Sequence, residues 1–310
     1  MLGSDSRPTW SRPPYSTSTG ACSMPDVPLF SVTIPAYNAE ATLAETVASV
    51  TAQTYLDWEL VIVDDGSTDG TRELAERLAA TDRRIRVVSQ ENRGSGGAYN
   101  TAVRNAQADL LVMLSADDLL LPGHLAALDA FIAQNPDAAI FTVGGWYEYE
   151  DGFRELQHLH EAWASPEGAS MADLLSACFF GIGAVYRREV FDAVGGFRED
   201  IYAEDYLFWL LALAHGYRHR YLDVPLAVHR RSAEQKSADA LRMRQVDARA
   251  VAEVVASGLL GERDRAVAER VMRGLRRNIA IRRAVGAILG QRLATRVLGR
   301  VGAIRRGSAR

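Results

Sequence analysis

The first 120 residues alternate between short apolar runs and amphipathic stretches. Continuous apolar runs close on polar residues at 29–38, 58–65, 85–89 and 110–114. Between them, leucines and valines recur at helical spacing over 40–53 and 71–80, and a glycine-rich loop at 92–97 opens a helix ending near 106. Strands without alternation are typical of a sheet that is buried on both faces. The pattern predicts βαβ units and a Rossmann-like, doubly wound, mostly parallel α/β sheet with flanking helices.

The second half of the chain is less regular. We predict strands at 138–143 and 181–186, helices at 170–177, 187–194 and 203–215, and a strand over 217–228 that Pro225 breaks. From about residue 237 the pattern is helical, with breaks near Gly258 and Gly261. We expect three parts: a disordered segment 1–26, rich in Ser, Thr, Pro and Gly; an α/β domain 27–236; and an Arg-rich helical extension 237–310.

Charge is distributed unevenly along the 310 residues. The formal net charge is −4, but residues 261–310 carry +11, so the rest of the chain carries about −15. Two cysteines are too few for a disulfide framework or a zinc site, which favours a reducing compartment. No apolar run reaches the roughly 18 residues of a transmembrane helix, and the amino terminus lacks the apolar core of a signal peptide.

Two acidic pairs close two of the apolar runs. Asp64 and Asp65 end the run at 58–65, and Asp117 and Asp118 follow the run at 110–114. Carboxyl ends of parallel strands share the edge at which open α/β sheets bind ligands. Carboxylates there either hold a cation of the Mg²⁺ or Mn²⁺ type on substrate phosphates, or cap the helix that begins near Pro122. Because two pairs on one edge repel each other, a shared ligand site is favoured.

Other stretches narrow the chemistry. Neither a G-x-x-x-x-G-K-[ST] loop nor a G-x-G-x-x-G after the first strand is present, which argues against P-loop NTPases and dinucleotide dehydrogenases. The glycine-rich loop at 92–97 either cradles a phosphate at a helix start or is a flexible connection. A third acidic pair, Glu204 and Asp205, opens the helix at 203–215.

Several stretches resemble family 2 glycosyltransferases, whose nucleotide-sugar domain has the GT-A fold. In the family's order they are SVTIPAYNAEATLAETVASVTAQT, WELVIVDDGSTDGT, NRGSGGAYNTAVRNA and VMLSADDLLLPG. The resemblance continues through GAVYRREVFDAVGGFRED and AEDYLFWLLALAHGY to about Val228. It implies a GT-A domain with a nucleotide-sugar half at 27–118, an acceptor half at 119–236, and a hexosyltransferase-type activity.

The resemblance also implies a role for each matching residue. Asp205, beside Glu204, corresponds to the catalytic base. Asp117 and Asp118 correspond to the end of the D-x-D-type motif that holds a divalent metal, Mg²⁺ or Mn²⁺, on the diphosphate. Binding of the nucleotide-sugar is implied for Pro35, Ala36, Tyr37, Asp64, Asp65, Asn92, Gly94, Ser95, Asn100 and Asp117.

The expected reaction is an inverting transfer from a nucleotide-diphospho-sugar, with UDP favoured, to a hydroxyl of a saccharide or lipid-linked acceptor. A metal stabilises the leaving group as a Lewis acid, and a carboxylate deprotonates the acceptor. The resemblance favours a bacterial enzyme of cell-surface polysaccharide or glycolipid synthesis. Two alternatives remain: a retaining GT-A enzyme, and a non-catalytic protein that binds sugar nucleotides.

Three positions depart from the family. Ser115 stands where Asp is frequent, and Tyr99 stands where many relatives have Arg. Ser232 falls where a metal-binding His is expected, so His229 either reaches the metal by a shifted register or is structural. Aromatic residues offer a further alternative, because they either stack on an acceptor sugar or pack in the core: Trp146, Tyr147, Tyr149, Phe179 and Phe180.

The tail at 261–310 interleaves arginines with aliphatic residues and is predicted to form a basic amphipathic helix. We expect peripheral contact with an anionic membrane, which would place a cytoplasmic enzyme on its inner face. The alternatives are packing on the acidic catalytic domain or a dimer contact, which leaves the oligomeric state open. Nucleic acid is not an expected partner, since the tail has no aromatic side chains for base stacking.

Overall fold

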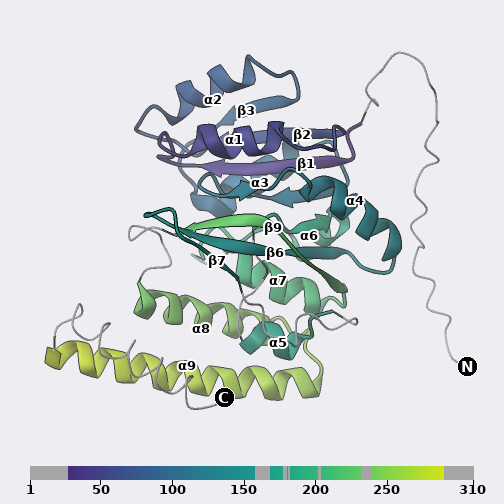
Figure 1. Ribbon diagram of the computed structural model, residues 1–310. Coiled ribbons are helices and arrows are strands. Elements are labelled where there is room, and N and C mark those ends of the chain that lie inside the picture. The colour runs from purple at the N-terminus through teal and green to yellow at the C-terminus, as the bar shows by residue number, and fades with distance from the viewer. Residues whose placement is uncertain are drawn as a thin grey trace, which may run out of the picture.

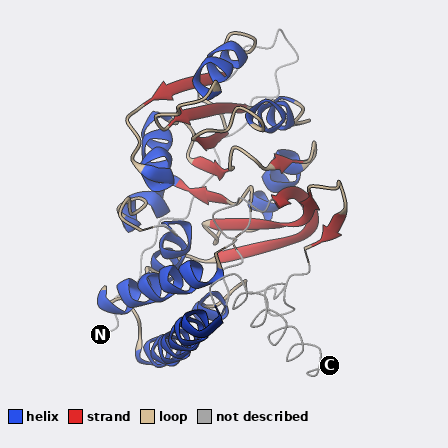
Figure 2. Cartoon of the chain, turned by 90° about the vertical axis from the view of Figure 1, so that its left-hand side faces the viewer, coloured by secondary structure: helices blue, strands red, loops and turns tan. Residues whose placement is uncertain are grey.

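A computed structural model describes residues 27–157, 168–176, 180, 182–201, 204–231 and 239–289. These residues form a nine-stranded sheet with helices on both sides and two long helices stacked beneath it (Figures 1 and 2). The strand order is β3-β2-β1-β4-β8-β6-β9-β5, with β7 paired to β6. The predicted α/β sheet with flanking helices is confirmed.

The elements have the following bounds. The strands are β1 Phe30–Ala36, β2 Trp58–Asp64, β3 Ile85–Ser89, β4 Leu110–Met113, β5 Leu119–Leu120, β6 Ile140–Tyr149, β7 Arg154–Leu156, β8 Val185–Arg187 and β9 His219–Arg231. The helices are α1 Leu43–Thr51, α2 Thr71–Ala79, α3 Gly94–Asn105, α4 His124–Gln134, α5 Met171–Ser176, α6 Arg188–Val194, α7 Glu204–Ala214, α8 Ala240–Ala256 and α9 Glu262–Leu289.

The first half of the sheet is parallel and buried on both faces. β1 lies between β2 and β4 and pairs in parallel with both. Its two buried hydroxyls are satisfied: Thr33 Oγ1 donates to the Val112 carbonyl at 2.9 Å, and Ser31 Oγ donates to Glu59 Oε1 at 2.6 Å. A buried strand tolerates such hydroxyls only when each has a partner, and this explains how polar residues fit into an otherwise apolar run.

The second half is mixed, and β9 crosses a position where we predicted a break. β8 is antiparallel to β4 and β6, whereas β9 is parallel to β6. β9 continues through Pro225, which lies opposite Gly144 where the register of β6 shifts on both sides of that glycine. Proline lacks a backbone N–H but is accepted at such irregularities. The break predicted at Pro225 is therefore wrong.

The glycine-rich stretch is the first turn of α3 rather than a loop up to Gly97. α3 begins at Gly94 and packs closely against a neighbouring segment. A Cβ on Gly96 would lie 2.6 Å from the Arg198 carbonyl oxygen, so a side chain there would collide with backbone. The glycine is required by close packing, which the sequence pattern did not distinguish from loop flexibility.

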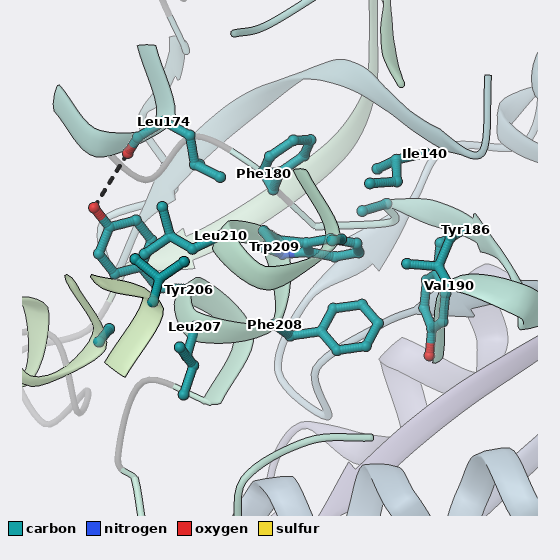
Figure 3. Close-up of a cluster of buried hydrophobic side chains, with 14 of the residues drawn as sticks. Ile140, Leu174, Phe180, Tyr186, Val190, Tyr206, Leu207, Phe208, Trp209 and Leu210 are labelled. Atoms are coloured by element: carbon teal, nitrogen blue, oxygen red, sulfur yellow. Dashed lines mark hydrogen bonds between the residues drawn. The ribbon is translucent and has the colours of Figure 1, made fainter. Parts of the chain in front are cut away.

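The C-terminal extension begins as a packed helix pair. α8 and α9 lie against each other beneath the sheet (Figure 1), and four small or branched residues are fully buried in a core shared with α7: Ala250, Val251, Val254 and Ala268. Figure 3 shows part of this core, in which Leu207, Phe208, Trp209 and Leu210 of α7 lie among side chains from other elements. This is the internal packing that we gave as an alternative to membrane contact, at least for the start of α9.

Candidate active site

Two acidic pairs lie at one edge of the sheet, on either side of β1. Asp64 is the last residue of β2, and Asp65 donates its backbone N–H to the Ala36 carbonyl at the end of β1, at 2.8 Å. Asp117 and Asp118 follow β4, the other neighbour of β1. Parallel pairing puts the carboxyl ends of these strands together, where doubly wound sheets bind ligands.

Asp118 does not cap a helix, and neither does Asp117. The N-cap of α4 is Gly123, which makes no side-chain cap hydrogen bond. Asp118 is instead buried, and its Oδ1 accepts a hydrogen bond from the Arg230 backbone N–H at 3.1 Å. Burial and then the charge of Asp117 raise the pKa of Asp118 well above its usual range, although hydrogen bonds from Arg230 and Ser115 oppose the rise. A cation beside such a carboxylate would stabilise its charged form, which favours the metal alternative over the cap.

His229, on β9, faces the same carboxylates. Its Nδ1 lies 4.0 Å from Asp118 Oδ1, and its Nε2 is buried without a hydrogen-bond partner. Burial, followed by the charge of Arg231, lowers the pKa of His229 to about 4 against the opposing charge of Asp117. The ring is therefore neutral near pH 7, the form in which histidine binds metals. Ser232, the position at which a histidine was expected, lies outside the described residues.

The donor atoms at this corner fit a hard divalent cation that is held together with phosphate. In the part of the chain that the structure describes, no group of three or more His, Cys, Asp and Glu side chains is placed to hold a metal ion. Asp117 and Asp118 offer carboxylate oxygens and His229 offers an unpaired imidazole nitrogen, all of which suit Mg²⁺ or Mn²⁺. A cation of this type commonly takes its remaining ligands from substrate phosphates.

Asp64 and Asp65 shape the opposite side of the edge. Asp65 Oδ1 accepts hydrogen bonds from Gln90 Nε2 at 2.7 Å and from the Arg93 backbone N–H at 2.9 Å. Asp64 Oδ1 accepts from the Ser67 backbone N–H at 3.2 Å. Both carboxylates are buried. Asp65 thus fixes the start of α3, and the contact expected between this pair and a nucleobase stays a prediction.

The end of β1 presents a side chain at the same edge. Pro35 and Ala36 close the strand, and Tyr37 beyond them is 51% exposed. Asn38 then adopts a left-handed conformation with φ of 49°, and its Oδ1 accepts a hydrogen bond from the Thr68 backbone N–H at 2.8 Å. This anchored turn keeps the Tyr37 side chain exposed at the ligand-binding edge of the sheet. The geometry allows the predicted contact of Tyr37 with the nucleobase or ribose, which stays a prediction.

The start of α3 is joined to the start of α7. Ser95 Oγ donates a hydrogen bond to Glu204 Oε1, and Glu204 is buried. Within the α3 turn, Asn92 Oδ1 accepts from the Gly94 backbone N–H at 3.2 Å. Asp205, the next residue of α7, is half-buried and lies beside this junction. The stretch predicted to bind the donor and the predicted catalytic pair are therefore in direct contact.

Asn100 supports this junction from one turn deeper. Its Nδ2 donates to the Phe197 carbonyl and its Oδ1 accepts from the Phe197 backbone N–H, both at 2.8 Å. Its Nδ2 also lies 3.3 Å from Glu199 Oε1. The buried amide therefore fixes the segment that leads to α7, and its expected contact with the donor stays a prediction.

Tyr99 lies near Asp118 and the pair of Glu204 and Asp205, a position that no local pattern in the sequence indicates. Its ring packs on Phe197 with centroids 5.2 Å apart, and its side chain is 5% exposed. Burial and then the charges of Glu204 and Asp205 raise the pKa of Tyr99 well above its usual value; hydrogen bonding with Ser115 opposes the rise. Two of the departures from the family, Tyr99 and Ser115, are thus neighbours in the fold.

The aromatic residues for which we left sugar stacking and core packing open do not lie in one place. Trp146, Tyr147 and Tyr149 lie together on β6, and Tyr147 meets His229 edge-on with centroids 5.6 Å apart. Phe180 is buried in the core, 5.0 Å from the ring of Trp209. Phe180 therefore follows the second alternative, core packing, because it packs against α7. Phe179 lies outside the described residues.

The fold is that of GT-A glycosyltransferases. Staphylococcus aureus TarS 1–349 in complex with UDP superposes with a TM-score of 0.61 and 21% identity, over 79% of this chain and 69% of that one. The mannosyltransferase PcManGT from Pyrobaculum calidifontis, in complex with GDP-Man and Mn²⁺, gives a TM-score of 0.66 and 22% identity, over 90% and 80% of the two chains.

The chain belongs to glycosyl transferase family 2, whose sequence profile matches residues 31–195, more than half of its length. WfgD of Escherichia coli, a UDP-Glc:alpha-D-GlcNAc-diphosphoundecaprenol beta-1,3-glucosyltransferase, is 30% identical over 187 residues, 60% of this chain and 70% of WfgD. The uncharacterized protein y4gI of Sinorhizobium fredii is 37% identical over 58% of this chain, and chondroitin synthase of E. coli is 40% identical over 38% of it. This chain spans only 20% and 17% of the lengths of those two proteins.

Proposed function

We propose that this protein is an inverting glycosyltransferase that moves a sugar from a nucleotide-diphospho-sugar to an acceptor hydroxyl. The observation that carries the proposal is the convergence of three acidic pairs around the start of α3. One pair follows β2, one follows β4, and Glu204 with Asp205 opens α7. A donor, a cation and a base placed in one site supply the positioning that such a transfer needs.

The substrate class is supported by the relatives. TarS has been solved with UDP and with UDP-GlcNAc, and PcManGT with GDP-Man and Mn²⁺. WfgD is named for transfer from UDP-Glc to a GlcNAc carried on a diphospholipid. We therefore propose a nucleotide-diphospho-sugar donor, with UDP favoured because members of the family commonly use it. We also propose an acceptor used in bacterial cell-surface polysaccharide or glycolipid synthesis.

Asp205 is proposed as the general base. Its carboxylate takes the proton of the acceptor hydroxyl while the acceptor oxygen bonds to the anomeric carbon. The bond from that carbon to the diphosphate oxygen breaks on the opposite face, and the diphosphate leaves with the electron pair. Direct displacement inverts the anomeric centre and needs no second carboxylate as nucleophile. Glu204, held by Ser95, keeps the start of α7 against α3 and so fixes the position of Asp205.

A divalent cation is proposed at Asp117 and Asp118. His229 lies beside Asp118, but these three side chains are not placed as a ready ligand set in the described residues, so we propose that the His229 ring moves when it binds the cation. When bound there, Mg²⁺ or Mn²⁺ would supply Lewis-acid stabilisation of the diphosphate leaving group. The chain's own residues prepare the site: the Arg230 backbone N–H orients Asp118, and burial keeps His229 neutral. Such a small set of protein ligands is expected to bind the cation mainly together with the donor diphosphate.

The function is tested by a thermal-shift screen of UDP- and GDP-sugars with and without Mn²⁺, followed by turnover of the donor that binds. We expect a donor to raise the melting temperature, since a ligand of the native state stabilises it. Asp205→Asn should keep that shift and lose at least about a hundredfold in turnover, the scale of general-base catalysis. The control is Asp192→Asn, an exposed carboxylate of α6. Full turnover by Asp205→Asn would refute the base assignment.

Two alternatives give different results in the same experiments. A retaining enzyme would form a product whose anomeric configuration, measured by NMR, equals that of the donor. A non-catalytic sugar-nucleotide-binding protein would show the thermal shift without any hydrolysis or transfer by the wild-type chain.

A further inference from the structure

One side of α1 contacts the backbone of segment 116–121, which carries the proposed cation ligands. Three polar side chains at helical spacing, in α1 or just after it, make these contacts: Thr46, Ser49 and Gln53. The hydroxyl of the first donates a hydrogen bond to the Ala116 carbonyl at 2.9 Å. The second accepts from the Leu120 backbone N–H at 3.2 Å, and the third donates to the Leu121 carbonyl at 2.8 Å. The segment is therefore bound to α1 along its length.

The contact with Thr46 lies inside a turn. Between β4 and β5, the Asp118 backbone N–H donates to the Ser115 carbonyl at 3.2 Å. The Ala116 carbonyl lies within that turn and belongs to the peptide unit that leads into Asp117. Because a peptide unit is planar, a bond that holds this carbonyl also fixes the direction of the chain at Asp117. Thr46 is fully buried, so water does not compete for its hydroxyl.

β9 makes a second contact with this turn and is joined to α1. The Arg230 backbone N–H donates to Asp118 Oδ1 at 3.1 Å. The side chain of the same arginine donates from Nη2 to Glu45 Oε2, and Glu45 directly precedes Thr46 on α1. Its Nε also lies 3.7 Å from Glu148 Oε2 on β6. These contacts form a frame around the turn: α1 binds its backbone, β9 binds its carboxylate, and the ion pair of Glu45 and Arg230 joins the two elements.

The placement of the ligands matters because few protein ligands are available to the proposed cation. Side chains of neighbouring residues point in different directions in an extended chain, so a turn is needed before Asp117 and Asp118 can face one ion. Groups that orient metal ligands without touching the metal change metal affinity by about 10- to 100-fold when they are replaced. The frame can act in this way, because it fixes the turn from outside the ligand set.

We propose that Thr46 and the ion pair of Glu45 and Arg230 are positioning groups, which hold Asp117 and Asp118 in the geometry that binds the divalent cation. The proposal rests on the cation site proposed above and adds the residues that make it rigid. Thr46 acts through the backbone, so its replacement weakens the binding of the cation without removing a ligand.

The test measures Mn²⁺ binding to the UDP-loaded whole chain by electron paramagnetic resonance, which detects the free ion. Thr46→Val keeps the shape of the side chain and removes its hydroxyl. We expect it to weaken Mn²⁺ binding about tenfold, the lower end for residues that orient metal ligands. Thr46→Ser keeps the hydroxyl and should bind Mn²⁺ nearly as the wild type does. UDP binding without Mn²⁺, measured by thermal shift, should be the same in all three chains.

Thr33→Val is the matched control. Thr33 is also fully buried, and its hydroxyl donates to a backbone carbonyl at 2.9 Å, but that carbonyl belongs to Val112 within β4, where the sheet fixes the backbone. The variant should lose a similar amount of stability in urea and keep its Mn²⁺ affinity. Equal weakening by Thr33→Val and Thr46→Val would overturn the inference, because lower stability alone would then explain the effect. Mn²⁺ affinity of Thr46→Val equal to that of the wild type would also overturn it.

Glu45→Gln tests the frame without a buried change, since 69% of the Glu45 side chain is exposed. We expect a loss of about threefold in Mn²⁺ affinity, because exposed ion pairs contribute little. Glu76→Gln, which breaks an exposed pair with Arg72 on α2, should have no effect. Unchanged affinity in Glu45→Gln would remove the ion pair from the frame, and would overturn the whole inference if Thr46→Val does not fold. Failure of the UDP-loaded wild type to bind Mn²⁺ would instead contradict the proposed cation site itself.

Discussion

His229 is the side chain with the clearest unmet bonding capacity in the candidate site. Its buried Nε2 has no hydrogen-bond partner, and it stands beside Asp118, whose charge is disfavoured by burial. A buried nitrogen without a partner carries a desolvation cost of about 1–3 kcal/mol, which a bound cation would offset. The arrangement therefore gives a direct test of the metal proposal at single residues.

We predict that Asp118→Asn and His229→Ala each weaken Mn²⁺ binding at least about tenfold in the presence of UDP, since each removes a ligand. Titration calorimetry of the UDP-loaded chain measures this without turnover. His215→Ala, which alters an exposed histidine just after α7, serves as the control and should bind Mn²⁺ as the wild type does. Unchanged affinity in His229→Ala would remove this residue from the metal site.

His219 makes stability depend on pH. Its Nδ1 accepts a hydrogen bond from the Ala169 backbone N–H at 3.1 Å, and its Nε2 lies 2.7 Å from Thr142 Oγ1. The first contact requires a neutral ring, and burial, with the charge of Arg220, lowers the pKa to about 3. Because the folded pKa lies below the unfolded value of about 6.5, the unfolded chain binds more protons between these values, and stability falls as pH falls through that window.

We predict that His219 accounts for about 2 kcal/mol of the stability lost between pH 6.5 and pH 5. Urea unfolding at both pH values measures this loss. The His219→Asn variant should be less stable at pH 7.5 and should show a smaller loss on acidification, while His215→Asn should match the wild type. An equal acid-induced loss in His219→Asn would show that this ring does not titrate on unfolding.

At the level of single residues, part of the candidate site can be predicted from the sequence. Asp64 and Asp117 close apolar runs, and the rule that parallel strands share a carboxyl edge is enough to bring them together. Tyr99 carries no comparable signal, because its importance depends on how α3 packs against the segment that leads to α7. In the sequence Ser115 is only a position that lacks the usual carboxylate, whereas the fold puts it beside Tyr99 and Asp118.

Among the elements, α3 determines how the site is assembled. Its first turn meets α7, and its far end is held by two arginines: Arg86 Nη2 donates to the Asn105 carbonyl, and Arg188 makes three further contacts. Arg188 Nη1 donates to the Val103 carbonyl at 3.0 Å, and its Nη2 donates to the carbonyls of Ala106 at 2.9 Å and Ala108 at 2.7 Å. The last carbonyls of a helix have few partners within it, and Arg188 adds to the bond that the Val103 carbonyl accepts from the Ala106 backbone N–H at 3.2 Å.

We predict that Arg188→Ala lowers the free energy of unfolding by about 2–3 kcal/mol, because hydrogen bonds from a charged group are lost at half-buried carbonyls. Arg188→Lys should recover only part of this loss, since an ammonium cannot reach three acceptors with a planar fork. Arg218→Ala, which removes an exposed partner of Asp137, should change stability by less than about 1 kcal/mol. Urea denaturation compares the three, and equal losses in Arg188→Ala and Arg218→Ala would contradict the prediction.

Element types were easier to predict than their ends. The 29–38, 58–65 and 85–89 runs all contain strands, because uninterrupted apolar residues suit a sheet covered on both faces. The strand predicted at 138–143 extends to Tyr149, since its polar half pairs with β7 and β9 rather than entering the core. Long-range pairing of this kind leaves no local pattern in the sequence.

Across the whole molecule, the basic extension divides into two parts. Val267, Val271, Met272 and Leu275 of α9 pack against the core shared with α7 and α8. Further along, α9 extends beyond the end of α8 at which that helix begins (Figure 1). In this part of α9, Ile281 is 44% exposed and has arginines near it in the sequence. Because the first part of α9 is packed against the core, the membrane contact predicted for the entire tail at 261–310 is wrong for that part. The predicted boundaries at 26 and 236, and the tail beyond 289, concern or adjoin residues outside the described ranges and stay predictions.

The outer part of α9 is where the membrane proposal can still apply. No helix among the described residues is long and apolar enough to span a bilayer. Arg276, Arg277 and Arg283 are exposed and Arg282 is half-buried, and Ile279, Ile281 and Val285 alternate with them. Each arginine near an anionic bilayer contributes about 1 kcal/mol, and the exposed Ile281, with the half-buried Ile279 and Val285 beside it, can enter the headgroup boundary. We propose that this segment, rather than all of 261–310, contacts an anionic membrane.

We predict that replacing Arg276, Arg277, Arg282 and Arg283 by Gln releases the full-length chain from vesicles that contain phosphatidylglycerol, as measured by co-sedimentation. A variant with the same change in charge, in which Arg263, Arg265, Arg270 and Arg273 become Gln, lies on the half of α9 whose aliphatic residues are already packed. It should keep most of the binding, because charge without exposed apolar side chains gives only weak, salt-sensitive attraction. Equal release by the two variants would show that net charge alone attracts the chain to the vesicle. Failure of the wild-type chain to sediment with these vesicles would exclude α9 as a membrane contact and leave packing or dimer formation as its role.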